Sequence, residues 1–166
     1  MSCAYTLMDS PVGTLTLVAR GDCLAAVLWE NERENRVRLG ELQRDDQHPL
    51  LQETARQLGD YFAGRRQRFE LPLDFQGTEF QREVWAALLT IPFGETRSYA
   101  QIAQQIGRPQ AVRAVGAANG RNPISIIAPC HRVIGASGSL TGFAGGLPVK
   151  QHLLSLEGRE SLALAL

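Results

Sequence analysis

The feature that most constrains the fold is a change of sequence pattern near residue 76. Before this point, residues 6–20 and 23–29 alternate apolar and polar side chains and are rich in β-branched residues, which is typical of strands. After it, apolar residues recur at helical spacing. A chain of 166 residues is long enough for one large core or two small ones. We therefore predict two domains, residues 1–76 and 77–166, in an α+β chain.

The first domain is expected to be a small antiparallel sheet followed by a helix. Turn sequences at 10–13 and 21–22 separate the strands, and residues 31–46 are a charged, poorly periodic connector. From Pro49 to Ala63 the pattern is amphipathic and predicts a helix that Gly64 ends. The side chains expected to face inward are Leu50, Leu51, Ala55, Leu58, Tyr61 and Phe62.

The second domain is expected to be helical, because two capping boxes indicate the starts of helices. Thr78 with Gln81 and Ser98 with Gln101 have the spacing at which side chains satisfy the first free amides of a helix. They predict helices at about 79–90 and 98–106. The apolar stripe of the first helix predicts a core position for Trp85 rather than a platform for a stacked base. That stripe consists of Phe80, Val84, Trp85, Leu88 and Leu89.

A turn at Gly107-Arg108-Pro109 joins the helix at 98–106 to a third helix, and the pair predicts a helix-turn-helix. In the third helix, at 110–119, Val112 and Val115 are expected to face the core, and Arg113 carries the only charge. The remaining surface is mostly alanine and glycine, without the side chains that read bases in the major groove. It suits close approach to the minor groove with Arg113 as a probe, or else tight packing inside the domain.

Charge is distributed unevenly along a chain whose net charge is zero. Residues 1–79 hold 9 basic and 13 acidic side chains, whereas residues 80–166 hold 8 basic and 4 acidic ones, and none of the acids lies between 96 and 156. The cations in this acid-free window suit contacts with phosphates, although the same pattern also fits a solvated basic face. They are Arg97, Arg108, Arg113, Arg121, Arg132 and Lys150.

The segment Pro129-Cys130-His131-Arg132-Val133 places a thiol beside a possible base. The thiolate is the reactive form of cysteine, and a neighbouring imidazole favours it. Glu157 is the first carboxylate after Glu95, so it is the obvious acceptor to orient His131. The competing interpretation is a buried, inert cysteine.

The cysteine pattern and the absence of long apolar runs predict a reduced, cytoplasmic protein. The three cysteines cannot all pair within one chain, contain no CxxC spacing and do not combine with the histidines as metal ligands. No apolar run approaches the ~18 residues of a membrane span, and no basic leader precedes residue 5. We expect no metal and no membrane association.

Three segments together resemble the O6-alkylguanine-DNA alkyltransferases. They are Asn119-Gly120-Arg121-Asn122-Pro123-Ile124, the Pro129–Val133 segment, and Gly142-Phe143-Ala144-Gly145-Gly146-Leu147. The resemblance extends over essentially the whole chain and is greatest to the short constitutive bacterial form. It implies an RNase H-like α/β first domain and a helix-turn-helix second domain. It also implies a suicide DNA repair protein that binds double-stranded DNA carrying O6-alkylguanine and needs no cofactor. We expect a monomer in solution; cooperative binding along DNA is left open.

The resemblance also assigns roles to residues. Cys130 would accept the alkyl group irreversibly, while His131, linked to it through a water and oriented by Glu157, would take the thiol proton. Tyr99 would donate a hydrogen bond to the flipped base, and Asn122 would tie the recognition helix to the cysteine segment. Arg113 would fill the gap that the flipped base leaves in the stack. The remaining expected DNA contacts are Ala114, Gly116, Ala117, Arg121 and Arg132, and the base pocket is expected to involve Cys130, Val133, Phe143 and Ala144.

One departure from the family pattern concerns the base pocket. The family commonly has tyrosine where this chain has Phe143, and often serine where it has Ala144. The less polar pocket would favour alkyl groups larger than methyl or lower the rate, and the sequence leaves open which. Whether O4-alkylthymine is also repaired is equally open. Two other functions remain as alternatives: a non-enzymatic lesion sensor of the alkyltransferase-like type, which Cys130 argues against, and a cysteine hydrolase built on Cys130, His131 and Glu157.

Overall fold

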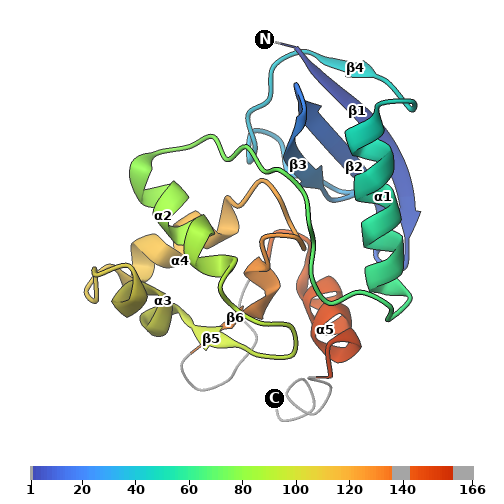
Figure 1. Ribbon diagram of the computed structural model, residues 1–166. Helices are drawn as coiled ribbons and strands as arrows, with labels where there is room; N and C mark the ends of the chain where they lie inside the picture. The colour runs from blue at the N-terminus through green and yellow to red at the C-terminus, as the bar shows by residue number, and fades with distance from the viewer. Residues whose placement is uncertain (1, 136–142, 159–166) are drawn as a thin grey trace. The chain divides into compact units, whose positions relative to one another are not determined.

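The computed structural model describes residues 2–135 and 143–158. It divides into two compact units. The first runs to Gln76 and also includes Pro123–Ser125, and the second comprises Gly77–Asn122 and the described chain from Ile126 onward. The α+β class predicted from the sequence is confirmed, with a sheet in the first unit and helices in the second (Figure 1).

The first unit is built on a four-stranded sheet of order β3-β2-β1-β4. The strands are β1 (Cys3–Ser10), β2 (Gly13–Arg20), β3 (Cys23–Leu28) and β4 (Leu42–Arg44). The first three pair antiparallel as predicted. The β1–β2 turn is tight because Ser10 pairs with Gly13, whose φ of 105° favours glycine. The short strand β4 lies within the predicted connector and pairs parallel to β1, which the sequence analysis did not anticipate.

A single helix, α1 (Pro49–Phe62), lies across the sheet of the first unit (Figure 1). It begins with Pro49 at its first turn and with His48 as N-cap, whose Nδ1 accepts a hydrogen bond from the Leu50 amide. Of the six residues predicted to face inward, Leu51, Leu58 and Tyr61 are buried and the other three are half-buried. The apolar face of α1 and the sheet thus form the core of this unit.

The far segment Pro123–Ser125 belongs to the first unit because it adds to the edge of its sheet. The Val27 amide donates to the Pro123 carbonyl at 2.9 Å, and Val27 forms a parallel bridge with Ile124. Leu24 forms a second bridge with Leu73. The edge strand β3 therefore has its free backbone groups paired at both places.

The second unit holds the remaining helices and a two-stranded sheet. Its elements are α2 (Glu79–Leu88), β5 (Arg97–Ser98), α3 (Tyr99–Gln105), α4 (Val112–Gly120), the 3-10 helix η1 (Cys130–Arg132), β6 (Val133–Ile134) and α5 (Leu147–Leu156). Both predicted capping boxes are confirmed, at Thr78 and Ser98. The core position of Trp85 is also confirmed, since it is 2% exposed and its Nε1 donates to the Ala118 carbonyl at 2.8 Å.

The helix-turn-helix is formed by α3 and α4, which pack against each other and against α2 (Figure 1). Gly107, with φ of 77°, allows the turn after α3. The second helix starts at Val112 rather than near 110, and its N-cap residue Ala111 offers no side-chain acceptor. The prediction that Val112 faces the core is wrong: this residue is 37% exposed, because it opens the helix, whereas Val115 one turn later is fully buried.

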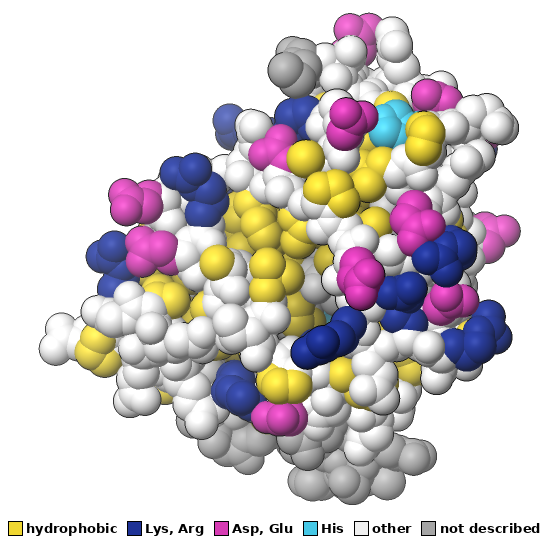
Figure 2. All heavy atoms as spheres, viewed as in Figure 1, with side chains coloured by type: hydrophobic (Ala, Val, Ile, Leu, Met, Phe, Trp, Pro, Cys, Tyr) yellow, Lys and Arg dark blue, Asp and Glu magenta, His cyan; other side chains and the backbone are white. Residues whose placement is uncertain are grey.

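Charged side chains of both signs lie side by side over α1 (Figure 2). Arg56 pairs with Glu53 and Asp60 on this helix, and Arg65 pairs with Asp60 just beyond it. Such exposed pairs contribute little to stability. Among the described residues, every helix is too short or too polar to cross a bilayer.

Candidate active site

The cysteine segment is held by a helical turn and a strand pair in the second unit. η1 contains Cys130, His131 and Arg132, all of them buried. Immediately after it, Val133 in β6 pairs parallel with Arg97 in β5, and this fixes the end of the turn. The three cysteines of the chain are free, and Cys130 is 4% exposed. A buried free thiol alone would fit the interpretation of an inert cysteine, so the residues around Cys130 determine whether it is reactive.

His131 and Glu157 meet inside the second unit, although 26 residues separate them. The His131 Nε2 and Glu157 Oε2 atoms are 2.8 Å apart, and both side chains are fully buried. Glu157 reaches this position as the C-cap residue of α5. Within the described chain, the other ring nitrogen of His131, Nδ1, is buried and has no hydrogen-bond partner. With Glu157 ionised, Nε2 carries the proton and Nδ1 presents a lone pair.

The pKa values of this pair support that protonation state. Burial by itself would raise the pKa of Glu157, but the hydrogen bonds from His131 and Arg132 and the charge of the Arg132 guanidinium outweigh it and lower the pKa to about 2. Burial lowers the pKa of His131 below its usual range, and Glu157 offsets only part of this effect. The site therefore contains an ionised carboxylate and a neutral imidazole at pH 7.

Arg132 is not at the DNA surface, and this prediction is corrected. Its Nε donates to Glu157 Oε1 at 2.8 Å, and its side chain is only 7% exposed. The guanidinium turns inward because a buried carboxylate and a backbone carbonyl, that of Ile91, satisfy its donors there. A phosphate cannot reach it without breaking these contacts.

Lys150 of α5 likewise lies in the interior rather than on a phosphate-binding face. It is fully buried, its Nζ donates to the Val133 carbonyl at 2.6 Å, and it lies 5.7 Å from the centre of the Phe143 ring. Burial lowers its pKa to about 8, and the nearby Cys130 partly opposes this shift. The sequence analysis grouped Lys150 with phosphate-binding cations. Its position seven residues before Glu157, the C-cap of α5, gave no signal of burial.

Two asparagines connect the end of α4 to the cysteine segment. Asn122 is fully buried, and its Nδ2 donates to the Ala128 carbonyl at 2.8 Å, in agreement with the tie that the resemblance implied. Asn119, which the sequence analysis did not assign, is buried and its Nδ2 lies 3.4 Å from the Cys130 carbonyl. Between Asn122 and the cysteine segment, Ile126 adopts φ of 72°, an unusual conformation for a β-branched residue that surrounding contacts must hold.

The exposed face of α4 is small and carries one long cation. Arg113, Ala114 and Ala117 are exposed, and Gly116 faces the Tyr99 ring closely enough that an added Cβ would lie 3.8 Å from it. Arg121, just after the helix, is also exposed. The alternative of an internal helix is thus wrong for this face. All five residues lie in the same unit as Cys130.

The residues predicted to line a base pocket differ in exposure. Val133 is fully buried, Tyr99 at the start of α3 and Phe143 are half-buried, and Ala144 is exposed. Gly142, which begins the third motif, lies outside the described residues. Residues 2–135 and 143–158 contain no group of three His, Cys, Asp or Glu side chains that could hold a metal ion.

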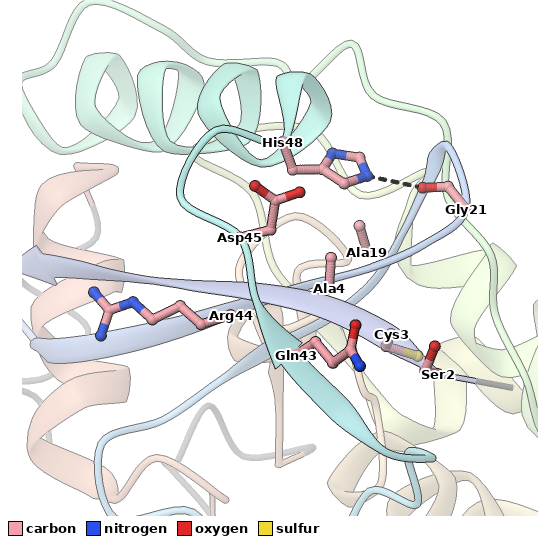
Figure 3. A pocket seen from close by; sticks show the side chains of 9 residues that line it. All are labelled: Ser2, Cys3, Ala4, Ala19, Gly21, Gln43, Arg44, Asp45 and His48. Atoms are coloured by element: carbon pink, nitrogen blue, oxygen red, sulfur yellow. Dashed lines mark hydrogen bonds between the residues drawn. The ribbon is translucent and has the colours of Figure 1, made fainter.

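A separate hollow of about 340 Å³ lies in the first unit and contains none of the predicted site residues (Figure 3). It is lined by β1, β4, the β2–β3 turn and His48, whose Nε2 donates to the Gly21 carbonyl at 3.1 Å. Cys3 also lines this hollow, but both ring nitrogens of His48 are already engaged, Nδ1 by the Leu50 amide and Nε2 by the Gly21 carbonyl.

Two protein-family models match the chain, one in each unit. Residues 3–75 match the ribonuclease-like domain of 6-O-methylguanine DNA methyltransferase, and residues 79–159 match its DNA-binding domain. The first match confirms the RNase H-like character expected for the N-terminal part.

Named relatives are similar over nearly their whole length. The methylated-DNA–protein-cysteine methyltransferase of Mycolicibacterium paratuberculosis is 52% identical over 159 residues, covering 96% of this chain and 94% of the relative. That of Methanosarcina acetivorans is 47% identical over 155 residues, covering 93% and 97%.

Solved structures show the same fold. The crystal structure of Mycobacterium tuberculosis OGT in complex with DNA has a TM-score of 0.86 and 50% identity, with 96% of this chain and 94% of that one covered. The O6-methylguanine-DNA methyltransferase of Pyrococcus kodakaraensis, at 18% identity, has a TM-score of 0.54 with 94% and 99% covered, and shows the fold alone.

Proposed function

This chain belongs to the 6-O-methylguanine DNA methyltransferase family and is a DNA repair methyltransferase, and we propose that Cys130 is the cysteine that receives the alkyl group. The observation that carries the proposal is that Cys130, His131 and Glu157 are all buried in the second unit. His131 Nε2 is bonded to Glu157 at 2.8 Å, and the unpartnered Nδ1 belongs to the residue next to the thiol. Cys3 lines a hollow with His48, but that imidazole already accepts from the Leu50 amide and donates to the Gly21 carbonyl.

The first step is removal of the thiol proton. His131 Nδ1 has the lone pair that can accept it, directly or through one bridging water, and Glu157 stabilises the imidazolium that forms. Lys150 adds positive charge near Cys130, which favours the thiolate. The proton is thus transferred inside a site from which bulk solvent is largely excluded.

The second step is an in-line displacement at the alkyl carbon. The Cys130 sulfur forms a bond to this carbon while the bond from the carbon to guanine O6 breaks, and the electron pair stays with the guanine. The base leaves in neutral form once a proton reaches it, initially with the Tyr99 hydroxyl as hydrogen-bond donor and finally with the thiol proton held by His131. Because water cannot displace the thioether, each molecule reacts once and needs no cofactor.

The DNA partner is proposed to be a duplex carrying O6-alkylguanine, bound through its minor groove. Small exposed side chains on α4 permit close approach, and Arg113 is long enough to replace the flipped base in the stack. Arg121 would contact the backbone. We expect a monomer, acting in the cytoplasm.

The pocket for the flipped base would be formed by Tyr99, Val133 and Phe143. Lys150 lies over the Phe143 ring and donates to the Val133 carbonyl, so one buried cation contacts two of the residues proposed to line this pocket. With phenylalanine at 143 and alanine at 144 this pocket would offer few polar side chains, which would either favour alkyl groups larger than methyl or lower the rate.

Intact-protein mass spectrometry with a duplex containing one O6-methylguanine tests the proposal. We expect one methyl group per protein molecule, mapped to the peptide containing Cys130, and none in Cys130→Ser. Cys23→Ser is the matched control, because Cys23 is also free, and it should react as the wild type does. Wild-type protein that binds the duplex without gaining mass would instead indicate a lesion sensor, and methylation at another cysteine would overturn the assignment of Cys130.

A further inference from the structure

The mechanism above uses Cys130, His131 and Glu157, but it gives no role to Arg132, which is buried in the same network. Its Nε and Nη2 donate to the two oxygens of Glu157 at 2.8 and 3.0 Å, and its Nη1 donates to the Ile91 carbonyl at 2.7 Å. The ring centre of Phe93 lies 5.8 Å from the guanidinium carbon. One side chain therefore links the site carboxylate to the segment that follows α2.

The geometry makes Glu157 a shared acceptor. Its Oε2 receives both His131 Nε2 and Arg132 Nη2, and its Oε1 receives Arg132 Nε. A bidentate guanidinium fixes the plane of a carboxylate more firmly than a single hydrogen bond does. The carboxylate charge is also balanced by the guanidinium, so the imidazole lies beside a neutralised pair rather than beside a bare anion.

We propose that Arg132 is a positioning residue for alkyl transfer, which orients Glu157 and keeps the His131 imidazole neutral, so that Nδ1 remains free for the Cys130 proton. The inference rests on the proposed function, because it assigns a task within the same proton transfer. It replaces the surface role that the sequence suggested for this arginine.

The charges around His131 give the physical reason. Burial and the positive charges of Arg132 and Lys150 lower the pKa of His131, whereas Glu157 raises it. If the guanidinium is removed, the buried carboxylate loses its charge partner, and the nearest group that can supply a cation is His131. A protonated imidazole carries hydrogen on both nitrogens and can no longer accept the thiol proton. The ionisable groups facing one another here are Cys130, His131, Arg132, Lys150 and Glu157.

The test is the pH dependence of single-turnover methylation of Cys130, measured from pH 5 to 9 with saturating O6-methylguanine duplex. In Arg132→Gln we expect the acid limb of the rate profile to move to higher pH by about one unit, a tenfold change in proton affinity. Arg132→Lys retains the charge but not the bidentate geometry, so its rate should fall while its acid limb moves less. A merely structural role would lower the rate at all pH values alike.

Arg36 supplies a matched control in the first unit. It is 5% exposed and makes the same bidentate contact with a carboxylate, that of Glu32. Arg36→Gln should leave the acid limb in place.

Histidine NMR provides a second readout, because the chain has only three histidines. Ring nitrogen shifts of labelled wild-type protein should show His131 as the neutral form protonated at Nε2, and both Arg132 variants can be followed in the same way. If Arg132→Gln fails to fold, the rate profile of Arg132→Lys and the wild-type NMR spectrum still test the role of Arg132.

The outcomes separate the two proposals. If folded Arg132 variants retain the wild-type acid limb, or if wild-type His131 is protonated at Nδ1, the role of Arg132 is wrong although the methyl transfer stands. If wild-type Cys130 is never methylated, the proposed function itself is wrong.

Discussion

The two units of the molecule treat charged side chains in opposite ways. Most ion pairs of the first unit lie at its surface, as with Arg44 and Asp46, whose side chains are both 52% exposed. The second unit buries four charged or titratable side chains close to a free thiol: His131, Arg132, Lys150 and Glu157. Because taking charges out of water costs free energy that packing alone would not require, this cluster indicates chemistry rather than stability.

The pair formed by Arg36 and Glu32 refines the comparison. It resembles the Arg132–Glu157 pair in geometry, yet it belongs to the first unit and Glu32 is 19% exposed. A partly buried ion pair therefore does not make a site. What distinguishes the second unit is that its carboxylate also holds an imidazole next to a cysteine.

The largest expected effect is on the free energy of unfolding, when the carboxylate is removed from the Arg132–Glu157 pair or from the Arg36–Glu32 pair. We expect Glu157→Gln to lower the free energy of unfolding by about 3–5 kcal/mol, because it leaves the buried Arg132 without a counter-charge. Glu32→Gln should lower it less, since water can reach that position. Urea denaturation followed by circular dichroism measures both, and equal losses would remove the distinction between the two pairs.

Acid should destabilise the second unit before carboxylates titrate. The pKa of His131 is lowered in the folded state, so below about 6.5 the unfolded chain binds a proton that the folded chain does not, and stability falls as pH decreases. Glu157, with its pKa lowered to about 2, adds a further loss as pH falls from about 4.5 towards 2. Trp85 fluorescence in a Trp29→Phe background, recorded during urea unfolding at pH 7 and pH 5, follows this unit.

Histidine variants supply the control for that experiment. His131→Gln should remove the loss of stability between pH 7 and pH 5, whereas replacement of the exposed His152 by glutamine should retain it. A wild-type stability that is unchanged at pH 5 would contradict a buried neutral His131.

Two glycines test how closely the second unit is packed. A Cβ at Gly77 would lie 2.6 Å from Gln81 Oε1 and 2.7 Å from the Trp85 ring, so Gly77→Ala should destabilise the protein by about 1–3 kcal/mol. A Cβ at Gly120, the last residue of α4, would have nothing within 4 Å, and alanine there should stabilise the protein by about 0.5–1 kcal/mol. Thermal denaturation should therefore show melting temperatures that shift in opposite directions.

The smallest effect is expected on the surface of α1. Hydrogen bonds from Arg56 and Gln57 lower the pKa of Glu53 to about 2, the same value as for Glu157, but the Glu53 side chain is 41% exposed. Solvent screening leaves little of this interaction for stability. Urea denaturation of Glu53→Gln should give no measurable change, and a loss comparable to that of Glu157→Gln would show that exposure is not what separates the two units.

Local signals in the sequence predicted local structure well. Both capping boxes, the helix at Pro49, the three antiparallel strands and the buried Trp85 depend on contacts between neighbours or on a sustained apolar pattern. The strand β4 has three exposed residues and a distant parallel partner, so no pattern marked it. The start of α4 was placed too early because Ala111 and the residues before it carry no capping side chain.

The site was predictable where its residues are neighbours in the chain or where few residues of the required type were available. Cys130 and His131 are neighbours in the chain, and Glu157 was the first carboxylate after a long acid-free stretch. The same acid-free stretch misled the interpretation of Arg132 and Lys150. Their partners are Glu157 and the backbone carbonyls of Ile91 and Val133, and a count of charges cannot reveal backbone acceptors that lie far along the chain.

The sequence by itself determined the helices α1 to α3, the strands β1 to β3 and the pairing of a thiol with a base, because these follow from side chains within a few residues of one another. Only the tertiary structure decided which charged side chains are buried. The inward turn of Arg132 and Lys150 depends on buried acceptors that exist once α5, η1 and the segment after α2 have come together. Desolvation is a property of the packed unit, so the protonation state of its base is decided there and not along the chain.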